Sequence, residues 1–362
     1  MVLIRLNNEQ KMIENEVKKF AQSELAPIAS EIDKEGLFPV DIVSKLSELG
    51  LSSLIVPEKY GGAGLDTTCL CIAVEELAAV SASVSLIFAV NNSLVAYPVM
   101  KFGSDQIKEQ YLKMISKGKI GGFAVETGYA LNTAQGVQEE KKGFFKFVLN
   151  GEKASFIILP VSTEKGKRFY IYDRDEKDVL SKNRILGMQA AGIIGLDTDI
   201  GMPVKDRFLI EPSDSKMISS DIQSYSEVIF SALSLGIAEA SYSAALGYSK
   251  ERHQFGRSIC DFPMVQEMLV DMRTKIAASK LLVFNAAAQI DAGVQNPLDS
   301  HIARLFTGNA ALSCGLNAIQ IHGGYGYTKE YPVERYMRDA KTIQLLSATP
   351  IDLTAACAKE LL

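Results

Sequence analysis

The sequence contains no tryptophan, only three histidines, and five cysteines that form no CxxC pair. Cys69 and Cys71 are two residues apart, which is too close for an unstrained disulfide and differs from the usual spacing of zinc ligands. The histidines, His253, His301 and His322, are far apart in the sequence. These scarcities predict reduced thiols and no metal site.

Basic residues are also in deficit, and long apolar runs are missing. The 38 Lys and Arg residues face 43 Asp and Glu residues, for a formal net charge of −5. This balance argues against nucleic acid as the main partner, because phosphate binding requires a basic surface.

No apolar run approaches the roughly 18 residues that cross a bilayer, and the N-terminus becomes charged too soon for a signal peptide. We therefore expect a cytoplasmic protein that does not enter a membrane.

Hydrophobic periodicity divides the 362 residues into three predicted domains. Residues 1–119 and 219–362 have apolar positions at helical spacing, whereas residues 120–218 have short β-rich runs. Helices are predicted over 8–33, 41–49, 67–80, 84–102, 105–116, 224–252, 263–292, 300–321 and 351–361, an extended run over 51–57, and strands over 144–149, 155–161, 168–172 and 208–210. The order predicts an α+β fold with an N-terminal all-α domain, a middle β domain and a C-terminal four-helix bundle.

Three segments carry the strongest functional signal. Residues 251–257 read ERHQFGR, residues 320–339 begin QIHGGYGY and continue with EYPVER and RD, and residues 57–66 read PEKYGGAGLD. In order and spacing they resemble the signatures of the acyl-CoA dehydrogenases, and the resemblance covers nearly the whole chain. It implies that family's three-domain fold, FAD at a subunit interface, a fatty or branched acyl-CoA substrate and α,β-dehydrogenation. It also implies dimers or tetramers, with an electron-transferring flavoprotein as the electron acceptor.

The resemblance also assigns cofactor-binding residues. In the family, the adenosine-pyrophosphate half of FAD crosses to the neighbouring subunit, where by resemblance it would meet Arg252, Phe255, Gln320, Gly323 and Gly324. Arginine forms charge-assisted bonds to phosphate, and glycines let backbone N–H groups approach an anion. The alternative is that the glycines only make a tight turn between helices. Arg252 and Gln320 at family positions favour phosphate contact.

The residue that should remove the substrate α-proton is missing. By resemblance the family's catalytic glutamate falls at Ser347, and the position that some relatives use instead falls at Ser226. A serine hydroxyl without an activating partner cannot act as a base near neutral pH. Glu227 follows one residue later, where the family usually has arginine, and one residue rotates a helical side chain by about 100°. We expect Glu227 to point away from the site, as a solvent or interface carboxylate.

The positions that would contact the flavin ring are altered as well. The family's Thr-Glu-Pro-x-x-Gly-Ser-Asp run corresponds to 125–132, where the Ser-Asp pair is gone and Glu126 precedes Thr127. The ring-covering tryptophan corresponds to Ser155, and the next polar contact to Ile157. The changes therefore affect the base and the ring contacts, whereas the residues for a neighbour's dinucleotide persist.

This asymmetry leads to three hypotheses. The first is a non-catalytic subunit, a pseudoenzyme chain in a heteromer such as a heterotetramer of lipid metabolism, whose sister acyl-CoA dehydrogenase subunit holds the flavin ring. The second is a self-sufficient, homo-oligomeric FAD-dependent acyl-CoA dehydrogenase with a displaced base, Glu227 or Glu126. The third is a cofactor-free protein for acyl-CoA binding or assembly. The sequence favours them in that order.

Overall fold

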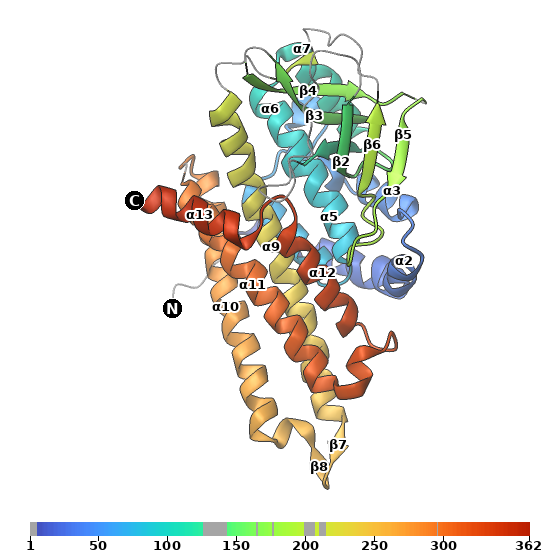
Figure 1. Ribbon diagram of the computed structural model, residues 1–362, viewed down its shortest axis with the longest axis vertical. Coiled ribbons are helices and arrows are strands. Elements are labelled where there is room, and N and C mark those ends of the chain that lie inside the picture. Colours follow the sequence, from blue (N-terminus) through green and yellow to red (C-terminus); the bar gives the residue numbers. More distant parts are fainter. Residues whose placement is uncertain are drawn as a thin grey trace.

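The architecture is taken from a computed structural model, which describes residues 6–125, 143–163, 166–175, 177–198, 207–209, 215–294 and 296–362. Helices form the N-terminal part, a six-stranded sheet follows, and long helices form the C-terminal part (Figure 1). This arrangement confirms the predicted fold class.

The N-terminal domain is entirely helical in the described residues. Its elements are α1 (Asn8–Phe20), η1 (Ala21–Leu25), η2 (Ala26–Ile28), α2 (Ala29–Glu35), α3 (Val40–Glu48), η3 (Leu51–Ser53), η4 (Glu58–Tyr60), α4 (Thr67–Ala78), α5 (Ala82–Val90), η5 (Asn91–Ala96), α6 (Tyr97–Phe102), α7 (Asp105–Ile107), η6 (Lys108–Leu112) and α8 (Lys113–Ser116). The prediction of an extended run at 51–57 is wrong, because this segment begins as the 3-10 helix η3. The side-chain amides of Asn91 and Asn92 donate to the buried carbonyls of Ser52 and Leu51, so these groups need no neighbouring strand.

The middle domain contains one six-stranded sheet in the order β4-β3-β1-β2-β6-β5. The strands are β1 (Gly121–Ala124), β2 (Gly143–Leu149), β3 (Phe156–Thr163), β4 (Gly166–Asp173), β5 (Val179–Lys182) and β6 (Ile194–Thr198). Strands β1 and β3 are parallel and the other neighbours are antiparallel. The strand predicted at 208–210 is wrong in its described part, where Phe208 makes only an isolated bridge with Tyr170.

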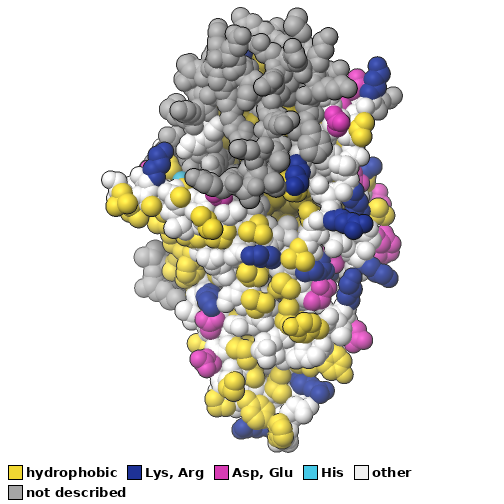
Figure 2. Space-filling model, viewed as in Figure 1, with side chains coloured by type: hydrophobic (Ala, Val, Ile, Leu, Met, Phe, Trp, Pro, Cys, Tyr) yellow, Lys and Arg dark blue, Asp and Glu magenta, His cyan; other side chains and the backbone are white. Residues whose placement is uncertain are grey.

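In the described residues, five α-helices and two short 3-10 helices form the C-terminal domain. The α-helices are α9 (Ser215–Glu251), α10 (Pro263–Asp291), α11 (Pro297–His322), α12 (Val333–Leu345) and α13 (Pro350–Leu361), and the 3-10 helices are η9 (Ile259–Asp261) and η10 (Gly323–Tyr327). A small hairpin of β7 (His253–Gln254) and β8 (Arg257–Ser258), followed by η9, joins α9 to α10. The sequence prediction omitted α12, which packs against both α9 and α11. Helix α9 begins before the predicted domain boundary at 219. The hairpin forms the tip farthest from the sheet (Figure 1), where Figure 2 shows hydrophobic and basic side chains together.

Two helical stretches are longer and more apolar than the sequence inspection indicated. Ala82–Phe102 and Ile218–Glu251 meet the length and composition of a membrane span, against our expectation that no run would do so. However, 89% and 78% of their most apolar windows are buried inside the structure. Burial against other helices explains their apolar composition, because a helix at the centre of a domain has no solvent-facing side.

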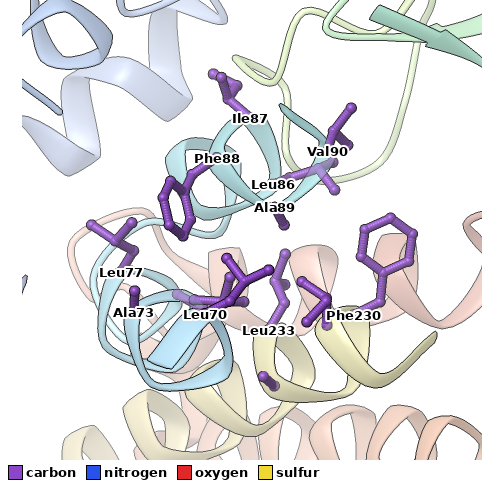
Figure 3. Close-up of a cluster of buried hydrophobic side chains, with 14 of the residues drawn as sticks. Leu70, Ala73, Leu77, Leu86, Ile87, Phe88, Ala89, Val90, Phe230 and Leu233 are labelled. Atoms are coloured by element: carbon purple, nitrogen blue, oxygen red, sulfur yellow. The ribbon is translucent and has the colours of Figure 1, made fainter. Parts of the chain in front are cut away.

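Helices α4, α5 and α9 share the main hydrophobic core. Figure 3 shows Leu70, Ala73 and Leu77 of α4, Leu86 to Val90 of α5, and Phe230 and Leu233 of α9. The backbones of α4 and α9 approach closely at Gly236, where an added Cβ would lie 2.3 Å from the Glu75 carbonyl oxygen and 2.7 Å from the Ala78 Cβ. This contact brings α9 against the N-terminal domain and thereby positions the side chains of α9 described below.

We predict that Gly236→Ala lowers the free energy of unfolding by about 1–3 kcal/mol, because the methyl group would overpack the α4–α9 contact. Gly247→Ala is a matched control on the same helix, since nothing lies within 4 Å of its added Cβ. There the lower entropy of the unfolded chain should raise stability by about 0.4–1 kcal/mol. Urea unfolding measures both, and equal effects of the two substitutions would contradict the close approach.

Candidate functional site

The structure brings several of the predicted cofactor-binding residues to one open groove of about 520 Å³. Arg252, at the end of α9, lies across this groove from Gly323 and Gly324, which follow α11. The groove is lined by Tyr248, Arg252, Gln254, Ile259, Ile321, His322, Gly323, Gly324, Tyr325 and Thr328. Gln320 is exposed on the last turn of α11 but does not line the groove.

Gly323, Gly324 and Gly326 differ in why the backbone at each position suits a glycine. Gly323 has φ +59°, a left-handed conformation that favours glycine, and Gly326 must lack a side chain because a Cβ would lie 2.5 Å from the Ile319 carbonyl oxygen. A tight turn therefore accounts for these two. Gly324 has an ordinary φ, and nothing lies within 4 Å of an added Cβ. Its backbone faces open space, as a ligand contact would require.

Phe255 stands at the outer end of the hairpin and is 94% exposed. Its φ of +52° and that of Gly256, +80°, are those of a two-residue β-turn of type I′. A phenylalanine in the left-handed region is strained, and an exposed ring gains nothing from burial. The hairpin therefore presents this ring outward, away from the chain's own core.

Aromatic side chains that the sequence analysis missed form the base of the groove. The ring of His322 stacks on Tyr248 at 4.2 Å between centroids, and Tyr331 meets both rings at steep angles. Nδ1 of His322 donates to the Ala318 carbonyl oxygen at 2.8 Å. Burial lowers the pKa of His322, so this ring is neutral at pH 7. His322 lay within the recognised motif, and that was the available signal for its role.

The groove suits the adenosine-pyrophosphate half of FAD. It combines an exposed guanidinium, an open glycine backbone and aromatic walls, which are groups that bind phosphate and a planar base. Within the residues that the structure describes, no group of three or more His, Cys, Asp or Glu side chains is arranged to hold a metal ion.

Neither serine at the two base positions has an activating partner in the described part of the chain. Ser226 is 2% exposed, and its hydroxyl donates to the Gln223 carbonyl oxygen at 2.9 Å. Ser347 is half-buried between α12 and α13, with a left-handed φ of +65°. A hydroxyl needs a neighbouring imidazole, amine or carboxylate to become a base near neutral pH.

Glu227 does not lie at the surface, which corrects the prediction of a solvent or interface carboxylate. It is 1% exposed, and its Oε2 lies 2.5 Å from Nδ1 of His301 on α11. Its Oε1 accepts a hydrogen bond from Gln223 at 2.8 Å. Glu227 lies one residue after Ser226 and so points away from the face of Ser226, but α11 covers that other face of α9. The available sequence signal for His301 was a lone histidine in a helix poor in charge.

The charges next to Glu227 make its burial tolerable. Burial alone would lower the pKa of His301, but the hydrogen bond to Glu227 and its charge, with a smaller effect from Glu360, raise that pKa above the usual imidazole value. Arg304 is also buried; burial lowers its pKa to about 10, and the charge of Glu227 opposes that shift. Arg304 is therefore charged at pH 7, and its charge and the raised pKa of His301 both favour the ionised carboxylate.

Arg304 also ties this layer to the turn at Ser347. Its guanidinium donates to the carbonyl oxygens of Ile343 and Leu346 at the end of α12, the second at 3.4 Å, and to the Ser234 hydroxyl of α9 at 3.4 Å. The Ile343 carbonyl also accepts the backbone N–H of Leu346 at 3.2 Å, so the arginine adds a second donor at this helix end and acts as a C-terminal cap. Helices α9, α11 and α12 are thus joined by one buried polar layer beside both serine positions.

The positions expected to contact the flavin ring do not fit that role. Ile157 has no exposed surface, and its side chain belongs to a second hydrophobic cluster with Leu159 and Tyr170. Ser155 is half-buried and lines a separate hollow beside Lys153. The run at 126–132, with the alternative base Glu126, lies outside the described residues. The described part of the ring site therefore lacks an accessible polar contact at Ile157.

We predict that the His301–Glu227 pair stabilises the fold more in acid than in alkali. Because the folded-state pKa of His301 is raised, its stabilisation is complete below the unfolded pKa of about 6.5 and is lost as pH rises through the folded value. His301→Gln keeps a donor for Glu227 but does not titrate. Urea unfolding should give the native chain an advantage over this variant at about pH 6 that shrinks at about pH 9. An advantage independent of pH would contradict the pairing.

The comparisons with known proteins agree with this geometry. The family described as "Acyl-CoA dehydrogenase, N-terminal domain" matches residues 7–119, and "Acyl-CoA dehydrogenase, C-terminal domain" matches residues 228–347. An acyl-CoA dehydrogenase of Bacillus subtilis is 31% identical over 96% of this chain and 96% of its own length. The mitochondrial short-chain specific acyl-CoA dehydrogenase of Rattus norvegicus is 33% identical over 96% of this chain and 88% of its own.

A solved structure shows the same fold. The butyryl-CoA dehydrogenase of Megasphaera elsdenii superimposes with a TM-score of 0.93 and 29% identity, covering 99% of each chain. With both family domains matched and relatives above 30% identity along nearly its full length, the chain belongs to the acyl-CoA dehydrogenase family of flavin-dependent oxidoreductases.

Proposed function

We propose that this chain is the non-catalytic subunit of a heteromeric FAD-dependent acyl-CoA dehydrogenase. Its groove, with Arg252, Gly323 and Gly324, and the exposed side chains of Phe255 and Gln320 outside the groove would hold the adenosine-pyrophosphate half of an FAD whose flavin ring lies in a sister subunit. The sister would also supply the base that removes the α-proton of the acyl-CoA. FAD bound there supplies the acceptor for the β-hydride.

The observation that carries the proposal is the contrast between the two ends of α9. At Arg252 the groove is open and its polar groups face solvent. At Ser226 the nearest carboxylate on the helix, that of Glu227, is committed to His301 and Gln223 in the interior. A carboxylate that must give up two hydrogen bonds and a buried charge partner is a poor base.

The distance between the two ends supports a division between chains. Ser226 lies inside α9 and Arg252 directly follows its last residue, so the two are 26 positions apart along the helix, about 39 Å at 1.5 Å per residue. A single dinucleotide does not span that distance. The groove and the base position of one chain therefore belong to two different cofactor sites, and a chain that keeps only the groove still completes the site of its neighbour.

The first test is flavin content. The chain purified alone should carry no stoichiometric flavin absorbance, because the ring has no site on it. The chain purified with its sister dehydrogenase should carry one FAD per two chains, and an acyl-CoA should bleach it. A yellow chain that is bleached when purified alone would refute the proposal and favour a self-sufficient enzyme with a displaced base.

The second test uses the heteromer with Arg252→Ala on this chain. Loss of a charge-assisted phosphate contact costs about 1.5–3 kcal/mol, so we predict that FAD binds roughly 10- to 150-fold more weakly while the two chains remain associated. Arg184→Ala removes an exposed arginine of the sheet domain, away from the groove, and should leave FAD affinity unchanged. FAD retention measured by fluorescence after dilution decides between these outcomes, and equal retention in both variants would contradict the assigned contact.

A further inference from the structure

Phe230 lies one helical turn after Ser226 and contacts the arginine that binds the turn before Ser347. It follows Ser226 by four residues on α9, so the two side chains share one face of the helix. Its ring centre is 5.8 Å from the guanidinium of Arg304, and that guanidinium donates to the carbonyl oxygen of Leu346, the residue before Ser347. Two independent contacts therefore place this ring beside the region where an acyl thioester would have to react.

The ring is part of a dense core. Phe230 has no exposed surface, and neither have Leu233, one turn farther along α9, and Leu86 of α5. Figure 3 shows Phe230 and Leu233 rising from α9 toward the α5 residues Leu86 and Val90. The apolar side chains of the two helices thus meet along the face that continues inward from Ser226.

The chemistry of an acyl-CoA fixes which part of it would need that space. The CoA portion has several phosphate charges and must remain near solvent or cations, because burying unpaired charge is costly. The acyl tail is apolar and gains free energy only by entering the interior. When the α-carbon of the acyl group lies beside Ser226 and Ser347, an acyl tail that extends into the interior along α9 meets Phe230.

We infer that Phe230 closes the acyl-tail space of this chain, so that it admits no extended acyl group. The inference rests on the proposed function and deepens it, because a subunit without a tail pocket would leave substrate selection to its sister. Phe230 is a specificity-determining residue by exclusion. The neighbouring Arg304 keeps the ring in place from one side and the residues of α5 from the other.

The test is the dependence of affinity on acyl length. Calorimetric titration of the purified full-length chain with butyryl-, hexanoyl- and octanoyl-CoA should show no gain in affinity with length, or no binding. In Phe230→Val, where the ring is removed, each added methylene should tighten binding by about fourfold until the new space is filled, as expected for about 0.8 kcal/mol per buried methylene. Phe230→Leu is a smaller truncation that serves if the valine variant does not fold.

Phe88→Val is the matched control. Phe88 is buried in the same core but is drawn on the side of α5 that faces Leu77, away from Phe230 (Figure 3). The Phe88→Val variant should lower the melting temperature as Phe230→Val does, but its affinity for acyl-CoA should remain independent of acyl length. A native chain whose affinity already rises about fourfold per methylene, or Phe230 variants that fold but gain nothing with length, would overturn the inference.

The flavin measurement separates this inference from the proposed function. A chain that is yellow and bleachable alone refutes the non-catalytic role, whereas the length dependence of the native chain tests only Phe230. A colourless chain with steep length dependence would refute the inference and leave the proposed function standing. A yellow, bleachable chain whose acyl-CoA affinity does not change with acyl length would refute the proposed function and leave the assignment of Phe230 standing.

Discussion

The buried ion pair of Glu227 and His301 is the interaction on which the interior of the C-terminal domain depends. Two helices, α9 and α11, meet at this pair, and Arg304, one turn after His301, extends the same polar layer to the end of α12. A buried carboxylate costs several kcal/mol unless charge and hydrogen bonds compensate it. Here both oxygens have partners, and the carboxylate is thereby held in a structural role.

In the described part of the chain, Glu227 is the carboxylate next to Ser226, and this commitment makes it poorly suited to act as a base. Proton abstraction needs a basic lone pair directed at the substrate, whereas the lone pairs of Glu227 are directed at His301 and Gln223. The capped end of α12 then places Ser347 in a fixed turn whose side chain cannot accept the proton either. On the apolar side of the same region, the Phe230 side chain has no exposed surface.

The sequence predicted the architecture well where periodicity was the signal and poorly where tertiary contacts decided the outcome. The long helices α10 and α11 and the strands β2, β3 and β4 lie close to their predicted ranges, whereas α9 ends close to its predicted end but begins nine residues earlier. The run at 51–57 has extended character by composition, but the amides of Asn91 and Asn92, about 40 residues later in the chain, satisfy its carbonyls in a helical turn. A local pattern cannot contain that information.

In the candidate site too, the sequence predicted the features set by neighbouring residues but not those set by tertiary contacts. The motif segments located Arg252, Gly323 and Gly324, because a groove built from helix ends depends on residues that are close in sequence to recognisable glycines. Glu227 was misplaced because its environment is made by α11, more than seventy residues away. Helical geometry gives the direction of a side chain on its own helix, but only the packing of the bundle says whether that direction leads to solvent.

The hairpin next to the groove has an energetic property that distinguishes it from the rest of the surface. Phe255 is held in a left-handed conformation, and its ring is 94% exposed with an edge contact to Phe262, so both its backbone and its exposed ring are unfavourable. By contrast, the part of α9 around Ser226 has paired polar side chains and a buried ring, which stabilise the chain by itself. We expect a strained, exposed ring where another subunit completes the contact. We expect an interior with all polar groups paired where no ligand binds. About 39 Å of rigid helix separates Ser226 from Arg252. Changes around Ser226 therefore need not disturb the groove, and proton removal and binding of the dinucleotide can reside in different chains.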